Sequence, residues 1–264
     1  MSVHVHIQAV AAIGPGADNW AEWQAVLQNE SAYVRSATRT PVLSVLPPAE
    51  RRRTGAGVKL ALACGMEALQ QAEVAPAEVT TVFCSSGCDG ENCHMICETL
   101  ASNDPLISPT RFHNSVHNAP SGYWGIASGA MLPSTSLCGY DGGFAVGMLE
   151  AAIQVAVEQR PVLLVVYDTL YPEPLHATRP LVDQFAVAML LTPGTTTHQL
   201  GSVTLELDDA AQTMMQNAEL ETVRSGIPAA RCLPLLSAIA QRQSQQLQLE
   251  YVNGRSLRVR YVPA

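Results

Sequence analysis

Four cysteines and one histidine crowd the segment CSSGCDGENCHMIC: Cys84, Cys88, Cys93, Cys97 and His94. Thiolate and imidazole groups are ligands that zinc prefers, so a zinc-binding structural module is one alternative for this segment. The cysteines are separated by three, four and three residues, whereas structural zinc sites generally use cysteine pairs with two residues between them. We therefore expect no bound metal, and small core positions on a helix for Cys93 and Cys97.

A second polar segment, residues 108–129, contains His113 and His117, four positions apart. Two such histidines could share a helix face and bind a metal, but this segment has no carboxylate or cysteine that would complete the ligand set. We instead expect the polar side chains of this segment to form hydrogen bonds with backbone groups at the start of a helix.

Residues 133–152 read as a short strand, a glycine-flanked turn and a long helix. This is the geometry that presents a nucleophile at a helix N-terminus. The positive end of the helix dipole would lower the pKa of a thiol placed there. The residue at the tip of the turn therefore decides what chemistry the segment can do.

The remaining pattern predicts the elements that position these segments. Short apolar strands are expected at 3–10, 79–84, 135–138, 162–166 and 186–191, with helices at 59–71, 91–101 and 143–159 between them. Strands that are apolar on both sides and alternate with helices indicate an α/β fold, with helices on both faces of a mainly parallel sheet.

Beyond Pro193-Gly194 the sequence becomes polar and rich in glutamine. A strand at 201–207 and a helix at 229–246 are expected there. Two alternating strands around Asn253-Gly254 then predict a closing β-hairpin. We expect residues 1–194 to form the main domain and residues 195–264 to be an extension packed on that domain.

Composition narrows the possible functions. The 264 residues carry 15 basic and 23 acidic side chains, a formal charge of −8, which argues against binding nucleic acid or an anionic membrane. Hydrophobic residues make up 47% and charged residues 14%, which favours an oligomer with apolar surface reserved for a partner. We expect no targeting leader, because the first residues of this sequence lack a basic region, and no apolar run is long enough to span a bilayer. Seven scattered cysteines favour a reducing cytoplasm.

Several motifs, in order, resemble the N-terminal half of β-ketoacyl synthases of the thiolase superfamily. They are the segment from Ser108-Pro109 through Asn118 and Gly122, the turn within 133–147, and Arg179-Pro180 followed by Asp183-Gln184-Phe185. More specifically, the segment FHNSVHNAPSGYWGI, preceded by CSSGCDGENCHMIC, resembles the chain-length-factor-like, ketosynthase-like proteins of bacterial aryl polyene gene clusters. The resemblance implies a thiolase-like layered α-β-α fold that is mainly the N-terminal ketosynthase half.

Counted from Pro133-Ser134, the resemblance places Asp141 where the family has its catalytic cysteine, and Cys138 three residues earlier. A carboxylate is a weak nucleophile towards a thioester, and its charge opposes the carbanion formed when malonyl decarboxylates. We therefore expect no catalytic residue here, and Asp141 could serve simply as a helix N-cap. The enzyme alternative is an active acyltransferase or ketosynthase that uses Cys138, with the turn slipped by three residues.

The family's two catalytic histidines lie in a C-terminal half that this sequence does not match. His198 is the one histidine after Leu191, and its context TTTHQLG does not resemble either family motif. His176 precedes the Arg-Pro element and so lies in the wrong half. The resemblance therefore implies a subunit that is not catalytic alone.

As a family member, the chain is expected to pair with an active β-ketoacyl-ACP synthase and to need no cofactor. Arg51, Arg52 and Arg53 could contact an acidic acyl carrier protein, although an ordinary solvated helix start is favoured. The residues expected at the acyl tunnel and partner interface are Phe112, His113, Asn118, Ala119, Gly122, Trp124, Ser134, Thr135, Ser136, Leu137 and Cys138.

Overall fold

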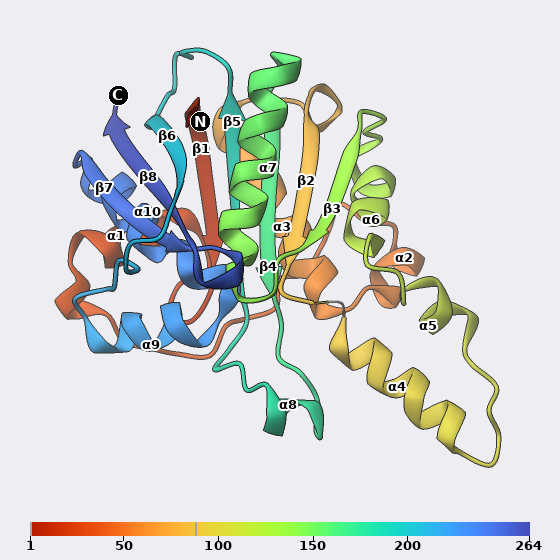
Figure 1. Cartoon of the computed structure of the whole chain (residues 1–264). Coiled ribbons are helices and arrows are strands. Elements are labelled where there is room, and N and C mark those ends of the chain that lie inside the picture. Colours follow the sequence, from red (N-terminus) through yellow and green to blue (C-terminus); the bar gives the residue numbers. More distant parts are fainter. Residues whose placement is uncertain (1, 88) are drawn as a thin grey trace.

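One eight-stranded sheet runs through residues 2–87 and 89–264, the part of the chain that this computed structural model describes. The strand order is β3-β2-β4-β5-β1-β6-β8-β7, so β3 and β7 are the edges (Figure 1). The strands are β1 (Ser2–Ile13), β2 (Thr80–Ser85), β3 (Ser134–Cys138), β4 (Val162–Asp168), β5 (Phe185–Thr192), β6 (Gly201–Asp208), β7 (Gln245–Glu250) and β8 (Ser256–Pro263).

The expectation of a mainly parallel sheet is wrong. β2 runs parallel to β3 and β4, whereas the pairings β4–β5, β5–β1, β1–β6, β6–β8 and β8–β7 are antiparallel. A strand buried on both faces is apolar in either kind of sheet, so its composition does not reveal its direction. The strand positions themselves are close to those predicted.

Helices cover both faces of the sheet, as Figure 1 shows, with α7 in front and α3 behind. The helices are α1 (Trp20–Gln28), α2 (Pro48–Arg53), α3 (Ala56–Ala72), α4 (Gly90–Ala101), α5 (Pro109–His113), α6 (Ala119–Ser128), α7 (Gly143–Glu158), α8 (Leu175–Thr178), α9 (Ala218–Gly226) and α10 (Leu233–Gln241). Short 3₁₀ segments are η1 (Glu30–Ala32), η2 (Pro76–Glu78), η3 (Tyr140–Gly142), η4 (Pro228–Cys232) and η5 (Val252–Gly254). The α-β-α layering expected from the sequence is confirmed.

Midway along strand β1, the alternation of its side chains between the two helical layers is reversed. Val5 and Ile7 pack in the layer of α7, whereas Ala9 and Ala11 pack in the layer of α3. The register against β5 shifts between Ile7 and Ala9, as at a β-bulge. An extra residue at a bulge moves every later side chain to the opposite face. The strand ends at Ile13, beyond the predicted end at residue 10.

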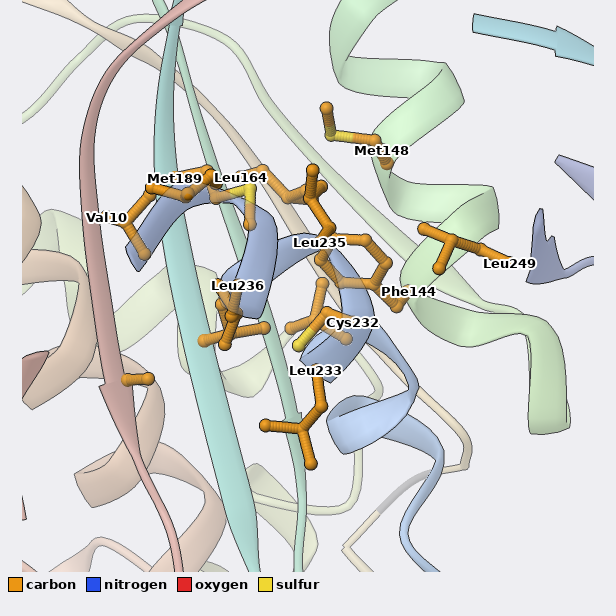
Figure 2. Close-up of a cluster of buried hydrophobic side chains, with 14 of the residues drawn as sticks. Val10, Phe144, Met148, Leu164, Met189, Cys232, Leu233, Leu235, Leu236 and Leu249 are labelled. Atoms are coloured by element: carbon orange, nitrogen blue, oxygen red, sulfur yellow. The ribbon is translucent and has the colours of Figure 1, made fainter. Parts of the chain in front are cut away.

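The larger core lies between the sheet and the helices α7 and α10 (Figure 2). Phe144 and Met148 of α7 meet Leu235 of α10 and Leu164 of β4 there, and all four are essentially inaccessible to solvent. Gly147 allows α7 to approach the sheet closely, because a Cβ atom at this position would lie 3.0 Å from Cβ of Cys84. The helix that follows the turn is therefore held tightly against the sheet.

The C-terminal region continues the same sheet, because β6 pairs with β1. The hairpin predicted around Asn253-Gly254 is confirmed as β7 and β8. The helix predicted at 229–246 is too long. α10 ends at Gln241, Arg242 caps it in the left-handed region (φ 52°), and residues 245–250 form a strand that buries Leu247 and Leu249. The division at residue 194 stays a prediction.

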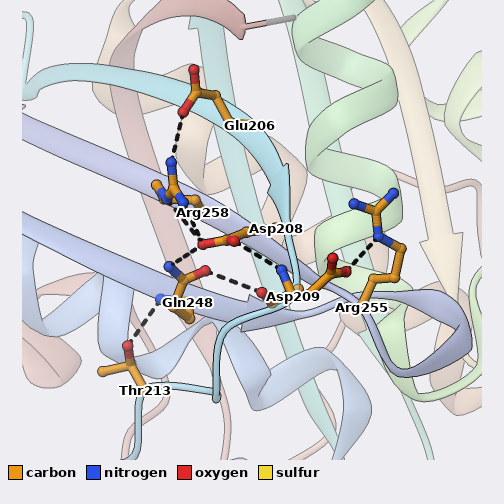
Figure 3. Close-up of polar contacts among 8 residues, drawn as sticks. Glu206, Asp208, Asp209, Thr213, Gln248, Arg255 and Arg258 are labelled. Atoms are coloured by element: carbon orange, nitrogen blue, oxygen red, sulfur yellow. Dashed lines mark hydrogen bonds and ion pairs between the residues drawn. The ribbon is translucent and has the colours of Figure 1, made fainter.

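The outer face of these C-terminal strands carries a polar network (Figure 3). Arg258 on β8 forms ion pairs with Glu206 (3.0 Å) and Asp208 (2.7 Å) on β6. The Nε2 atom of Gln248 donates to Asp208 at 2.8 Å. Opposite charges on neighbouring strands of an exposed face support the pairing modestly, so this face is structural in character.

Within the described residues, no helix has the length and apolar character that crossing a membrane requires.

Candidate functional site

The predicted strand–turn–helix is confirmed at β3, η3 and α7. Gly139 directly follows β3. A Cβ atom at this position would lie 2.6 Å from Cα of Gly143, so a larger residue would force the turn open. Tyr140 has a φ of 48°, in the left-handed region that residues other than glycine rarely adopt. The turn is therefore a tight, strained elbow of the kind that exposes a side chain at its tip.

Asp141 at this elbow is bound by two arginines. Nη2 of Arg179 lies 2.8 Å from Oδ1 of Asp141, and Nη2 of Arg231 lies 3.7 Å from Oδ2. The Arg179 guanidinium also stacks over the ring of Tyr140, 3.6 Å from its centroid. Burial alone would lower the pKa of Arg179, but hydrogen bonds to Asp141 and Tyr171 hold this pKa above its ordinary value.

The suggestion that Asp141 is the N-cap of α7 is therefore wrong. The N-cap of α7 is Gly142, which makes no side-chain capping bond. Asp141 instead joins the elbow to two later parts of the chain: Arg179, after α8, and Arg231 in η4. Arg231 in turn pairs with Glu250 at the end of β7. One carboxylate thus connects three segments that are far apart in sequence.

The C-terminal hairpin packs against the elbow from one side. A Cβ atom at Gly142 would lie 3.0 Å from the backbone carbonyl carbon of Tyr251. Arg179 and Arg231 are mostly buried, with 17% and 13% of their side chains exposed, and Asp141 is 34% exposed. The tip of the elbow, where a nucleophile would be presented, is therefore held against other segments of the same protein by ion pairs and by this close backbone contact.

A cavity opens at the ends of β2 and β4, between the start of α3 and the start of α6. Its apolar lining includes Val58, Ala119 and Pro120, and its polar lining includes Asn114 and His117. The cavity thus has a small apolar wall beside several polar side chains.

Asp168, at the end of β4, also lines this cavity and is 4% exposed. Its carboxylate accepts hydrogen bonds from the backbone N–H groups of Ser86 (2.8 Å) and Ala229 (2.7 Å). Burial raises the pKa of Asp168 from 3.8 to about 6, and these hydrogen bonds limit the rise.

Asp168 should make stability depend on pH. The folded carboxyl keeps its proton to higher pH than the unfolded one, so its contribution is complete below pH 3.8 and is lost as the pH rises to about 6. Denaturant unfolding of the wild type and Asp168→Asn should show the wild type losing up to about 3 kcal/mol relative to the variant across this range. A difference that does not change with pH would contradict this.

Five residues predicted at the acyl tunnel and interface line one surface groove along α5 and α6: Phe112, His113, Asn118, Ala119 and Gly122. Ala119 lines both this groove and the neighbouring cavity. Trp124 is placed differently, because it is 2% exposed and packs in the core with its ring 6.1 Å from that of Phe83. Sequence spacing does not distinguish groove from core on a short helix such as α6.

The other predicted interface residues, Ser134, Thr135, Ser136, Leu137 and Cys138, form the edge strand β3. Exposed apolar side chains flank this edge on both sides. Ile126 of α6 and Met131 just beyond it are 52% and 93% exposed, and Ile153 and Val157 on α7 are 38% and 76% exposed. α7 lies next to this strand, since Gln154 donates to Oγ1 of Thr135.

The chemistry-bearing residues that lie away from the elbow are scattered. The expectation that Cys93 and Cys97 occupy core positions is wrong, because both are exposed on α4. Cys84 is buried in β2, and His94 pairs with Glu98 at 3.3 Å. Cys88 lies outside the described residues. Among residues 2–87 and 89–264, no three His, Cys, Asp or Glu side chains are grouped so that they could hold a metal ion.

The arginine triplet ends a helix rather than starting one. Arg51, Arg52 and Arg53 form the last turn of α2, where cations interact favourably with the helix dipole. Arg51 donates to the Leu43 carbonyl and Arg53 pairs with Glu50. A role in contacting a carrier protein stays a prediction.

Sequence reasoning missed Arg231, Glu250 and Asp168. Asp168 is the last residue of the buried, otherwise apolar strand β4, a signal that could have identified it. Arg231 and Glu250 carry no such signal, because only the packing of η4 and β7 brings them to the elbow.

Comparison with known proteins gives both a family and a fold. A family model described as beta-ketoacyl synthase, N-terminal domain, matches residues 20–253. No curated protein sequence matches the chain.

Similar solved structures include a ketosynthase (ApeO) in complex with its chain length factor (ApeC) from Xenorhabdus doucetiae, with 23% identity, a TM-score of 0.74, and coverage of 97% of this chain and 98% of that one. The ishigamide ketosynthase/chain length factor is 12% identical over 99% of both chains, with a TM-score of 0.75. A type II PKS acyl-carrier protein complex with its ketosynthase, AntDE:AntF, is 11% identical over 100% of both chains, also with a TM-score of 0.75. At these identities the likeness establishes the fold.

Proposed function

Because this chain belongs to the beta-ketoacyl synthase family, we propose that it is a non-catalytic, chain-length-factor-like subunit that pairs with an active β-ketoacyl-ACP synthase. In this proposal the chain supplies a wall of the partner's acyl tunnel and leaves the chemistry to the partner. One observation carries it: Asp141, at the tip of the elbow, is bound by Arg179 and Arg231.

That arrangement is unsuited to condensation. A nucleophile must bring an available electron pair to the thioester carbonyl, and a carboxylate is weak in this role even when it is free. The lone pairs of Asp141 are directed at two guanidinium groups. Turning the carboxylate towards a substrate would leave two mostly buried arginines without their shared counter-charge, which is costly.

The edge strand β3 supports pairing with a ketosynthase subunit. An unpaired strand edge presents backbone N–H and C=O groups that another strand can bind. Exposed apolar side chains on α6 and α7 border that edge on both faces, as at the core of a protein interface. The similarity to a structure of a ketosynthase with its chain length factor points to the same kind of partner.

The cavity and groove support a role in limiting acyl length. Both are lined by Ala119, and the groove opens on the same side of the sheet as the exposed side chain of Ile126. A tunnel that reaches across the interface would end against these side chains. The segment FHNSVHNAPSGYWGI resembles proteins of aryl polyene clusters, so we extend the proposal to aryl polyene products. The intermediates would be carried on acyl carrier protein.

Pairing is tested by co-expression with a tagged β-ketoacyl-ACP synthase from the same organism. Met131→Glu should reduce the amount of chain recovered with the ketosynthase about tenfold or more, because a charge would enter an apolar contact. Val262→Glu is the matched control, since Val262 is 47% exposed on β8 near the opposite edge of the sheet. Equal recovery of both variants, or a wild-type chain that is monomeric and has no affinity for the ketosynthase, would refute the proposal.

A further inference from the structure

Two histidines lie side by side on strand β1, away from the elbow and the cavity. His4 and His6 are two positions apart, so their side chains project from the same face of the sheet. Their ring centroids lie 5.1 Å apart and the ring planes are nearly perpendicular, at 86°. His4 is exposed and His6 is half-buried. The fold thus holds two imidazoles close together where solvent can reach them.

The pair lies on a part of the sheet beyond the end of α3. The residues that alternate with the two histidines, Val5 and Ile7, face the layer of α7, so the imidazoles face the side of α3. α3 ends at Ala72, whose carbonyl accepts a hydrogen bond from Gln8 at 3.3 Å. The end of this helix therefore lies over Gln8 and leaves the preceding imidazoles open to an ion.

Each imidazole is held by a polar side chain from a neighbouring segment. Nδ1 of His4 lies 3.1 Å from Oγ1 of Thr204, directly opposite on β6. Nδ1 of His6 lies 2.9 Å from Nε2 of Gln199, and half a turn of this amide would bring its oxygen there instead. With Nδ1–H donating to these oxygens, Nε2 of each ring keeps a lone pair. Metal-binding histidines are generally oriented in this way.

The separation of the rings fits two imidazoles bound to one ion. With metal–nitrogen bonds of about 2.0–2.1 Å, each ring centre lies about 3.2 Å from the metal, and two rings at right or tetrahedral angles are about 4.5–5.2 Å apart. The observed 5.1 Å falls in this range. No three metal-ligating side chains are grouped within the described residues, so water would complete the coordination.

We propose that His4 and His6 together bind one divalent transition-metal ion, with Thr204 and Gln199 orienting the two rings. Imidazole nitrogen suits copper, nickel and zinc, and Cu²⁺ is bound most strongly of these when the ligands are the same. In the sheet, β2, β4 and β5 lie between β1 and the edge strand β3 (Figure 1). Metal binding here is therefore independent of the proposed pairing with a ketosynthase.

The test is a calorimetric titration of the full-length chain with Cu²⁺ at neutral pH. A histidine-free tag at the amino end keeps the terminal amine away from His4, and N-ethylmaleimide blocks the exposed thiols. We expect one ion per chain, bound more tightly than Ni²⁺ or Zn²⁺. His4→Asn and His6→Asn should each weaken binding by about tenfold or more, since each removes one of two protein ligands.

Two further variants separate this pair from general binding to surface histidines. Thr204→Val removes the acceptor for Nδ1–H of His4 and should weaken binding about tenfold, the low end of the range for such a partner. His198→Asn is the matched control, because His198 is exposed nearby in the chain, and it should bind Cu²⁺ like the wild type.

A measurement on the wild type needs no variant to fold. Electron paramagnetic resonance of the bound Cu²⁺ should show coupling to the nitrogens of two imidazoles. Full affinity in either His4→Asn or His6→Asn, an equal loss in His198→Asn, or coupling to fewer than two imidazoles would overturn the inference.

Discussion

Replacing Ala119 with phenylalanine should shorten the longest acyl chain that the complex with the ketosynthase makes, by at least one elongation step. Ala119 is the first residue of α6 and lines both the cavity and the groove. A benzyl group there would fill space that a growing chain needs, and close-packed walls do not yield without cost. Mass spectrometry of the released products gives the length distribution directly.

Two controls separate a steric effect from damage to the complex. Ala119→Ser changes the volume little and should leave the distribution as it is. Ala101→Phe adds the same bulk at an exposed position at the end of α4, outside the groove and the cavity, and should also have no effect. If Ala119→Phe yields wild-type products at a wild-type rate, then Ala119 does not face the tunnel.

Replacing Asp141 with alanine should lower the free energy of unfolding by about 1–3 kcal/mol. The substitution leaves Arg179 and Arg231, both mostly buried, near each other without the carboxylate between them. It also disconnects the elbow from η4, although the pair between Arg231 and Glu250 remains. Denaturant unfolding monitored by tryptophan fluorescence measures the loss.

Asp141→Asn is the matched variant, because the amide oxygen can still accept from Arg179 while the charge is lost. We expect its stability to lie between those of the wild type and Asp141→Ala. Condensation per folded complex should stay nearly unchanged in both, since the partner supplies the nucleophile. A large loss of condensation with stability unaltered would give Asp141 a catalytic part and reverse the assignment.

Local patterns were sufficient for the strands and for the elbow. The apolar run before Gly139 and the long amphipathic stretch after Gly142 are visible in the sequence and appear as β3 and α7. The hairpin around Asn253-Gly254 was equally clear, because a left-handed turn favours those residue types. Such features depend on neighbours in the chain, so a single sequence contains them.

Sequence patterns gave wrong predictions where contacts between distant residues determine the structure. The direction of β5 beside β4 depends on how the chain returns between them, and both strands are apolar in either direction. Trp124 could have lain in the groove, but the approach of α6 to Phe83 places it in the core. The helix predicted through residue 246 ends at Gln241, because the next residues form a strand that buries Leu247 and Leu249.

By itself, the sequence determined that this chain has a layered α/β fold with a carboxylate at the tip of its elbow, because residue types and short-range spacing are properties of the chain. Only the tertiary structure decided what that carboxylate does. Arg179 and Arg231 follow it by 38 and 90 positions, and the folded sheet brings both guanidinium groups to Asp141. The contact of 3.6 Å between the Cys138 sulfur and the His117 ring arose in the same way, because these residues are 21 positions apart and only packing sets the distance between them.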